Sequence, residues 1–282
     1  MKRNLGLLYT LPVTAWISFF FVIPLGIIFL YSFMEKGLYG GVVYRFSLAA
    51  YQALFNRAFI QVTFSTLWIS LVSTTLTVLI ALPCSYFIAR SAHKTFFLFL
   101  VIIPFWTNFL IRIYAWIAIL GNNGFLNNLL LQLGLTDSYV QFLYTKYAVI
   151  VVLVYTYLPF AILPLYATIE KFDFSLLEAA QDLGASKSQA MRKVLIPNIK
   201  GGLVTAVLFT FIPAFGAYAV PQLVGGSDSY MLGNIIAREL TVTRNWPLSS
   251  AISLVITLVT TLCVLLLLRL NAAKERKNRA RG

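Results

Sequence analysis

The sequence is poor in charge, in cysteine and in histidine. Only 11% of its 282 residues are charged and 60% are hydrophobic, whereas about a quarter of a soluble domain is charged. The two cysteines, Cys84 and Cys263, lie inside apolar runs without a CxxC pair or a Cys/His cluster, which argues against a disulfide framework and a structural zinc site. His93 is the only histidine, so histidine-based acid–base catalysis has almost no residues to use. These absences indicate an integral membrane protein.

Motifs for energy conversion are also missing. The sequence has no GxxxxGK[ST] phosphate-binding loop, no GxSxG and no HExxH, so we do not expect it to hydrolyse ATP or to act as an intramembrane hydrolase. None of its nine Asp and Glu residues lies inside an apolar run, where proton-driven transporters usually need titratable groups. We therefore expect no enzymatic activity and no cofactor on this chain, and an energy source outside it.

Six apolar runs reach the roughly 20 residues that a helix needs to cross the hydrocarbon core. The first exceeds the roughly 7–15-residue core of a secretory signal, so we interpret it as a retained span. The predicted fold class is all-α integral membrane protein, and an even number of spans puts both termini on one side. The six predicted transmembrane helices are Leu11–Phe33, Val62–Ala89, Thr95–Leu120, Tyr147–Ile169, Gly201–Val224 and Ser249–Leu270.

The distribution of positive charge indicates which side is cytoplasmic. The net charge is +13, and most of the 22 Lys and Arg residues lie at the N-terminus, in the loop Arg90–Lys94, in Lys171–Lys200 and in the tail from Arg269. Cytoplasmic loops carry the excess of Lys and Arg, so we predict a multi-pass protein of the cell (inner) membrane with both termini cytoplasmic. The basic tail is expected to contact lipid headgroups rather than nucleic acid.

The predicted spans and charged segments divide the chain into three parts. Residues 1–61 are an N-terminal span with an outer-face segment, 62–270 are the transmembrane core, and 271–282 are a basic cytoplasmic tail. On the outer face, Gly121–Gly124 is a turn signal, and Phe125–Leu133 has helical apolar spacing but is too short to span the membrane.

The stretch Asp173–Pro197 is the only long polar run between two predicted spans. It predicts two short helices joined at Gly184, which stands where a left-handed residue ends a helix, and Pro197 stops or restarts the chain. Such an amphipathic hairpin at a membrane surface suits docking of a soluble partner, although a plain connector can have the same caps. The predicted capping boxes are Ser175 with Glu178 and Ser186 with Gln189, and the predicted apolar face is Leu176, Leu177, Ala180 and Leu183.

Three pieces of this stretch, Glu178-Ala179-Ala180, Leu183-Gly184-Ala185-Ser186 and Ile196-Pro197, resemble the EAA loop of the membrane subunits of binding-protein-dependent ABC importers. The resemblance implies a coupling helix that sits in a cleft of a separate ATPase subunit. The residues that it assigns to ATPase coupling are Glu178, Ala179, Ala180, Asp182, Leu183 and Gly184.

Arg112 is the one charge clearly inside an apolar run, and an intramembrane charge is a functional-site hypothesis by default. Helical spacing puts Asn108, Arg112 and Trp116 on one face. Arg112 fits a translocation path or a subunit contact, and it fits equally a side chain that snorkels to the outer surface.

Further residues, Pro104–Asn108, Ile111–Trp116, Gly121–Gly124, Leu163–Tyr166 and Glu170-Lys171, make the chain similar to the spermidine/putrescine permeases of the PotB/PotH type, which are type I ABC importers. The similarity covers the chain from the first span onward. It implies a heterodimer with a second permease, two ATPase subunits that hold ATP and Mg²⁺, and an extracytoplasmic solute-binding protein. It also implies transport by alternating access.

A polyamine cargo needs carboxylates or aromatic faces along its way. A permease for another small organic cation or an amino-acid-like solute remains an alternative, and so does a passive channel or a structural membrane subunit. On the path Arg112 would repel a cation, so it either points into a helix contact or faces an acidic side on the partner permease. The predicted path residues are Trp106, Asn108, Arg112, Tyr114, Tyr155, Tyr157 and Tyr218.

Overall fold

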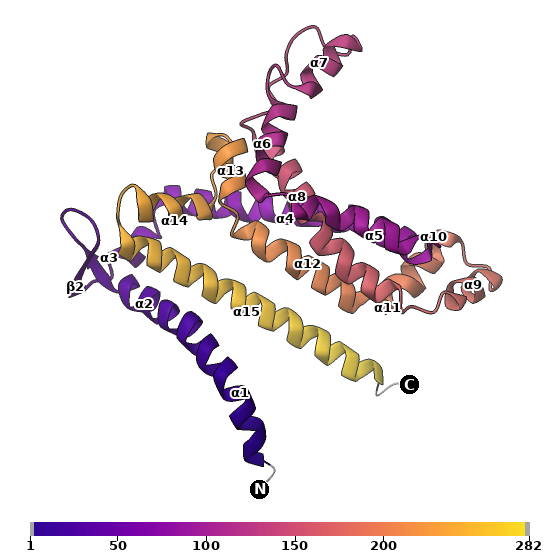
Figure 1. The fold of residues 1–282 in the computed structure, drawn as a ribbon, viewed down its shortest axis with the longest axis horizontal. Helices are drawn as coiled ribbons and strands as arrows, with labels where there is room; N and C mark the ends of the chain where they lie inside the picture. Colours follow the sequence, from indigo (N-terminus) through magenta and orange to yellow (C-terminus); the bar gives the residue numbers. More distant parts are fainter. Residues whose placement is uncertain (1–2, 280–282) are drawn as a thin grey trace. The chain divides into compact units, whose positions relative to one another are not determined.

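The computed structural model describes the backbone of residues 3–279 and the side chains of residues 9–266 and 269. It falls into two compact units (Figure 1), one of residues up to 61 together with 235–266, and one of residues 62–234 followed by the last part of the chain. The predicted basic tail, 271–282, has no described side chains. In the described part, five helices are long and apolar enough to cross a membrane, or six if one bent pair counts as a span.

The first unit combines the N-terminal span, a small hairpin and the last long helix. The two strands of the hairpin pair antiparallel, and the ring of Phe33 stacks on that of Phe46 at 6.1 Å. The sequence predicted an outer segment here but no strand, so the hairpin is an addition to the all-α prediction. The elements are α1 (Arg3–Ile17), η1 (Ser18–Val22, a π-helix), α2 (Ile23–Ser32), β1 (Met34–Lys36), β2 (Val42–Phe46), α3 (Ala49–Ala53) and α15 (Trp246–Arg279).

The second unit is all helical. Its long helices α8 and α12 pack against one another, and at Gly202 they approach so closely that an added Cβ would overlap the side chain of Thr168. The elements are α4 (Arg57–Arg90), α5 (Lys94–Ile102), η2 (Ile103–Trp106), α6 (Phe109–Leu120), α7 (Phe125–Gln132), α8 (Lys146–Ile169), α9 (Ser175–Asp182), α10 (Lys187–Ala190), η3 (Met191–Leu195, a π-helix), α11 (Ile196–Asn198), α12 (Lys200–Phe215), α13 (Ala219–Val224), η4 (Ser227–Ser229) and α14 (Leu232–Thr241, which continues into the first unit).

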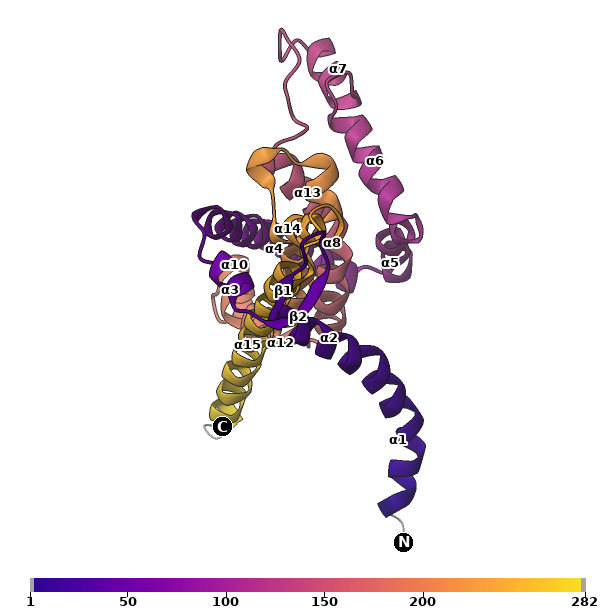
Figure 2. The ribbon, with the colours of Figure 1, turned by 90° about the vertical axis from the view of Figure 1, so that its left-hand side faces the viewer.

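The predicted third span, Thr95–Leu120, is not one helix. Pro104 lies in the short 3₁₀-helix η2, and Thr107 is extended with φ −75° and ψ 145°. Asn108 then caps a new helix by accepting a hydrogen bond from the backbone N–H of Leu110 at 2.8 Å. A proline followed by a good N-cap residue ends one helix and starts the next. The apolar helical length at this place is Phe109–Gln132, formed by α6 and α7, which Figure 2 shows running on from one another.

The predicted turn at Gly121–Gly124 and the short helix that follows it are both present. The N–H of Gly124 donates to the carbonyl of Gly121 at 2.9 Å, and α7 follows as Phe125–Gln132. The sequence did not predict the buried Asn127, whose side chain bonds the backbone of Gly121 and Val140 and so closes the loop beyond α7.

The predicted fifth span, Gly201–Val224, also has to be corrected. Helix α12 ends at Phe215, and a short break precedes α13. At its other end, α12 meets the helical stretch Lys187–Asn198 at a bend of 75°, where Pro197 lies in the first turn of α11. The helical backbone runs through Pro197 and is interrupted only at Ile199, so the predicted stop or restart lies two residues later than Pro197.

Candidate functional site: the segment between α8 and α12

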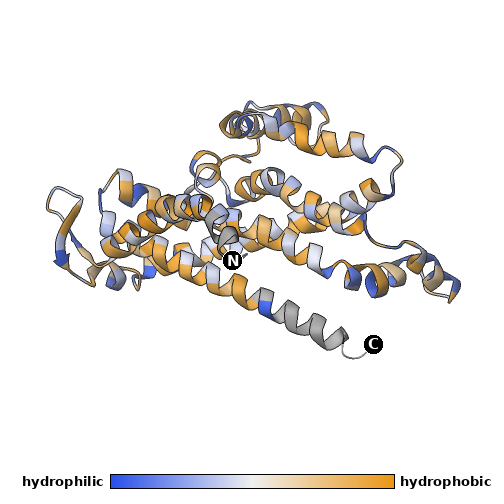
Figure 3. Ribbon diagram, turned by 60° about the horizontal axis from the view of Figure 1, so that its bottom comes forward, coloured by the Kyte–Doolittle hydropathy of each residue, from blue (hydrophilic) through white to orange (hydrophobic). Residues whose placement is uncertain are grey.

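The polar segment between α8 and α12 forms two helical pieces, as predicted. Figure 3 shows hydrophilic residues gathered on this segment, in contrast to the apolar helices on either side. The first piece is α9, and the second runs through α10, η3 and α11 without a break in the helical backbone.

The first predicted capping box, Ser175 with Glu178, is wrong. Ser175 is already inside α9, and the residue before it, Phe174, makes no side-chain cap. Instead, Oδ1 of Asp173 accepts a hydrogen bond from the N–H of Ser175 at 3.0 Å. The bonds from Ser175 hold the pKa of the Asp173 carboxyl below its usual value of 3.8. Asp173 caps the free backbone N–H groups at the start of α9 in place of Ser175, because a charged carboxylate accepts hydrogen bonds more strongly than a hydroxyl.

The end of α9 is a complete Schellman motif, which confirms the role predicted for Gly184. Gly184 has φ +88°, its N–H donates to the carbonyl of Gln181 at 2.8 Å, and the N–H of Ala185 donates to that of Ala180 at 3.0 Å. These two bonds satisfy carbonyls that the helix end leaves free. A left-handed backbone is needed to make both, and glycine adopts it without steric cost.

The second predicted capping box is present. Ser186 Oγ accepts a hydrogen bond from the N–H of Gln189, and the Gln189 side chain accepts one from the N–H of Ser186 at 3.0 Å. The two pieces therefore have fixed ends on both sides of Gly184.

The apolar side of the segment is anchored in the helix bundle by two of the four predicted residues, Leu177 and Ala180, together with residues that were not predicted. Leu177, Ala190 and Leu195 are almost fully buried and belong to one core cluster with residues of α4, α8 and α12. By contrast, Leu176 is 46% exposed and Leu183 is 90% exposed, so the predicted single face is wrong. Leu183 is the last residue before the left-handed turn, where the helical spacing no longer applies.

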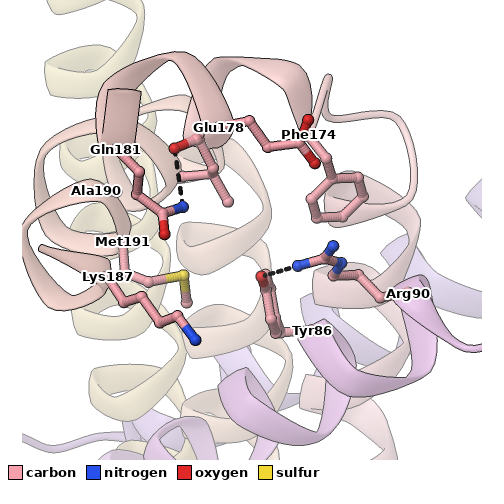
Figure 4. Close-up of a pocket in the computed structure, with 9 residues that line it drawn as sticks. Tyr86, Arg90, Phe174, Glu178, Gln181, Lys187, Ala190 and Met191 are labelled. Carbon is pink, nitrogen blue, oxygen red and sulfur yellow. Dashed lines mark hydrogen bonds between the residues drawn. The ribbon is translucent and has the colours of Figure 1, made fainter. Parts of the chain in front are cut away.

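A cavity of about 510 Å³ lies between this segment and the end of α4. Figure 4 shows its lining, with Tyr86 and Arg90 reaching from α4 toward Phe174. Arg90 Nη1 donates to the hydroxyl of Tyr86 at 3.1 Å, and its guanidinium carbon lies 5.4 Å from the centre of the Phe174 ring. The carboxylate of Glu178 is near enough to stabilise the Arg90 charge. The remaining lining residues are Leu177, Gln181, Lys187, Ala190 and Met191.

A second polar contact lies at the start of α5. Lys94 Nζ donates to Glu170 Oε1 at 2.6 Å, and both side chains are partly exposed. The bond from Lys94, followed by one from the hydroxyl of Tyr166, holds the pKa of the Glu170 carboxyl below its usual value of 4.5. The same bond raises the pKa of the Lys94 ammonium above 10.5. The residues of these two contacts lie at the ends of predicted spans, and the sequence did not single them out as site residues: Tyr86, Arg90, Lys94 and Glu170.

Three of the other coupling residues, Glu178, Ala179 and Asp182, are exposed on α9. Ala180 is half-buried and packs against the core cluster. The six residues predicted for coupling are therefore not all on the exposed side of the segment. Their role in coupling stays a prediction at this point.

The seven predicted path residues are spread over several elements. Asn108 caps the backbone of α6, Tyr157 donates to the carbonyl of Pro213 at 3.1 Å, and the ring of Tyr155 meets that of Trp116 at 5.5 Å. These three side chains have internal partners. The other aromatic candidates are largely exposed: Trp106, Tyr114 and Tyr218.

Arg112 lies on aromatic rings and not on a carboxylate. Its guanidinium carbon is 4.7 Å from the centre of the Phe105 ring and 5.8 Å from that of Phe109. Its Nε and Nη1 are buried and have no hydrogen-bond partner among the described residues. A cation over an aromatic face is stabilised electrostatically, which accounts for a half-buried charge in an apolar run.

The chain matches a family model described as "Binding-protein-dependent transport system inner membrane component" over residues 5–280. The chain belongs to this family. The permease is thus a multi-pass inner-membrane subunit of an ABC importer, a transport component that works with a binding protein, as the EAA-like residues predicted.

Two relatives carry the resemblance further. The permease is 37% identical to the spermidine/putrescine transport system permease protein PotB of Haemophilus influenzae over 267 residues, which cover 94% of this chain and 93% of that protein. It is 36% identical to PotB of Escherichia coli K12, with coverage of 94% and 97%. The predicted likeness to the PotB type is confirmed.

The fold has known counterparts among solved structures. One is a bacterial ABC transporter involved in the import of the acidic polysaccharide alginate, with a TM-score of 0.78 and 19% identity over 96% of both chains. The other is a bacterial alginate ABC transporter in complex with an alginate pentasaccharide-bound periplasmic protein, with a TM-score of 0.75 and 19% identity over 94% of this chain and 93% of that one. At this identity they establish an ABC permease fold and nothing about cargo.

Proposed function

We propose that the permease imports polyamines of the spermidine/putrescine class by alternating access, driven by ATP hydrolysis on a separate subunit. The proposal of a polyamine cargo is supported by the similarity to PotB along 94% of the chain. The proposal of the mechanism is supported by the anchored segment between α8 and α12, whose exposed tip lies at Leu183 and Gly184.

In this proposal the segment is the coupling helix and faces the cytoplasm. The excess of Lys and Arg in the loop Arg90–Lys94 and in Lys171–Lys200 supports this side. With six spans, both termini are also cytoplasmic, and the hairpin of β1 and β2 is on the outer side. In this count α12 is the fifth span, and the stretch Lys187–Asn198 before the 75° bend belongs to the coupling segment outside the membrane.

The proposed importer contains this permease, a second permease, two ATPase subunits and an extracytoplasmic binding protein. ATP and Mg²⁺ belong to the ATPase subunits, because the chain carries no phosphate-binding loop. Closure of the ATPase pair pushes on α9, and the buried side chains Leu177 and Leu195 pass the displacement to the helix bundle. The bundle then opens outward to receive cargo, a rigid-body transition of the kind known from other transporters.

One observation favours a different cargo. The permease is also 33% identical over 241 residues to the inner membrane ABC transporter permease protein YdcU of Escherichia coli K12, whose name states no solute. Arg112, a cation beside the aromatic side chains proposed for the path, does not attract a polyamine. The second candidate is therefore an importer of the same architecture for an amino-acid-like solute, whose carboxylate a guanidinium attracts. Another small organic cation is an alternative that Arg112 does not favour.

The test is ATPase activity of the native complex in nanodiscs with its binding protein, with spermidine, putrescine or an unrelated solute added. Stimulation by spermidine or putrescine is expected. Stimulation only by a different solute would overturn the proposal of a polyamine cargo and would still support an ATP-driven importer. A complex without an ATPase, or one that conducts solute without ATP, overturns the importer and leaves a channel or a structural subunit.

A further inference from the structure

We propose that the turn between α4 and α5, residues Arg90–Lys94, is a two-point latch that holds the coupling segment to two transmembrane helices and passes its displacement to both. The inference rests on the proposed function, and it assigns a positioning role to Arg90 and Lys94. Neither residue lies in the EAA-like stretch or on the surface of α9 predicted for coupling.

The first point of the latch joins α4 to α9. Arg90 is the last residue of α4, and its guanidinium lies over two aromatic rings, 5.4 Å from the centre of Phe174 and 5.9 Å from that of Tyr86. The rings of Tyr86 and Phe174 also meet edge to face at 6.0 Å. Phe174 directly precedes α9, so these contacts hold the beginning of the coupling helix against the end of α4.

The second point joins α5 to α8. Lys94 is the first residue of α5, and Glu170 directly follows the last residue of α8. Their bond of 2.6 Å is one of two ion pairs among the described side chains. The hydroxyl of Tyr166, one turn earlier on α8, donates to the same carboxylate and so fixes its position.

The two points are close in sequence but act on different helices. Only three residues separate Arg90 from Lys94, so the turn is too short to absorb a displacement of α9 on its own. A movement of the coupling segment therefore reaches α4 at one end of the turn and α5 at the other. Helix α5 leads into η2 and the break at Thr107, and Arg112 lies just beyond that break.

The buried core under α9 is a second connection of the segment to the bundle. Leu177, Ala190 and Leu195 share a cluster with α4, α8 and α12, and Phe97, Leu98 and Val101 of α5 pack against it through non-directional contacts. The latch adds directional contacts at a partly exposed surface, where they can change without opening the core. Such contacts contribute little to the stability of the fold. Their proposed role is to make α5 move together with α9.

The decisive experiment exchanges the charges of the second point. Lys94→Glu, Glu170→Lys and the double exchange are compared in proteoliposomes of the whole importer, with radiolabelled spermidine uptake and ATP hydrolysis measured together. We expect each single variant to lower uptake per ATP about 2- to 5-fold, the range that a partly exposed ion pair supplies, and the double exchange to restore most of it. Glu170→Gln, which keeps the shape of the side chain, is the milder second variant if a reversal prevents assembly.

The matched control is the other ion pair, Glu35 with Arg45 at 3.6 Å on the outer hairpin. Exchange of its charges is expected to leave uptake per ATP unchanged. For the first point, Arg90→Lys keeps the charge but loses the planar group that stacks on Phe174, and we expect it to lower uptake per ATP in the same way. Tyr86→Phe keeps the ring and removes the hydrogen bond, and a smaller loss is expected.

Hydrogen–deuterium exchange on the purified complex provides a readout that does not depend on the cargo. Loss of the latch should raise exchange of residues 171–184 and leave the amides of α12 unchanged. The latch is overturned if the single charge-reversal variants keep both hydrogen exchange and uptake per ATP at wild-type values. The wild-type complex could also show no spermidine uptake while the single charge reversals raise hydrogen exchange and the double reversal returns it to the wild-type level. This result would overturn the proposed cargo and support the latch.

Discussion

At the scale of single residues, Gly184 shows how a functional segment depends on one backbone angle. Its φ of +88° closes the Schellman motif, yet a Cβ added at Gly184 meets nothing within 4 Å. A larger side chain is therefore opposed by the backbone alone and not by a neighbour. The left-handed region costs a non-glycine residue about 1–2 kcal/mol, and Asn tolerates it better than most residues.

We predict that Gly184→Val uncouples the importer while Gly184→Asn remains close to wild type. A β-branched residue is a poor occupant of the left-handed region, so the turn after α9 shifts and moves Leu183. Copurification of the ATPase subunit and uptake per ATP measure the effect. Normal ATPase-coupled uptake by the Val variant would show that this turn does not transmit the motion.

Gly202 is limited by space, in contrast to Gly184. A Cβ at Gly202 would overlap the side chain of Thr168 on α8, whereas one at the neighbouring Gly201 meets nothing within 4 Å. We predict that Gly202→Ala destabilises the permease by about 1–3 kcal/mol, and that Gly201→Ala stabilises it by about 0.5–1 kcal/mol because alanine is the better helix former. The midpoint of thermal unfolding in detergent checks both. Equal midpoints for the two variants would show that α8 and α12 do not pack through Gly202.

Sequence alone predicted the residues whose role is local and missed those whose role depends on a distant contact. Gly184 and Ser186 were found because caps follow fixed spacing rules. Ser175 was wrong because Asp173 offered a stronger acceptor two residues earlier. The contacts of Arg90 with Phe174 and of Glu170 with Lys94 could not be predicted, since more than 70 residues of chain separate the two members of each pair.

At the scale of elements, apolar length predicted where helices lie but not where they break. The pattern of apolar residues continues through Asn108 and through Gly216, so the interruptions between η2 and α6 and after α12 are invisible to it. They come from backbone chemistry, a proline followed by an N-cap in the first case. The hairpin of β1 and β2 was missed because its strands are only three and five residues long.

The second piece of the coupling segment supplies a prediction at this scale. Ser186→Ala removes one half of the capping box at the start of α10, and we expect a loss of about 1 kcal/mol in the local stability of this helix. Hydrogen exchange of residues 187–195 measures it. Ser188→Ala, an exposed position inside the same helix, is the control and is expected to change little. Equal exchange in both variants would mean that Ser186 does not cap α10.

At the scale of the whole molecule, the direction of transport depends on the side on which the coupling segment lies. The positive charge that assigns this side also surrounds the latch, since Lys171 is next to Glu170 and lowers the pKa of its carboxyl further. In the proposed topology, the same charges therefore orient the chain and stabilise one of its contacts. A change of pH tests the second role without affecting the first.

The contribution of the Lys94–Glu170 bond to coupling should be constant across neutral pH and lost at both extremes. The pKa of Glu170 is lowered from 4.5, so its contribution is complete above that value and disappears as the pH falls through the lower, folded-state pKa. The pKa of Lys94 is raised from 10.5, so its contribution is complete below that value and disappears as the pH rises through the higher one.

We therefore predict that the difference in uptake per ATP between wild type and Glu170→Gln is flat between pH values of about 5 and 10. Parallel profiles of the two proteins in proteoliposomes measure it, with the pH varied on the side of the ATPase. Tyr166 and Lys171 also face this carboxylate. A difference between the two proteins that appears or vanishes inside this pH range would show that the bond between Lys94 and Glu170 is not the decisive contact of the turn.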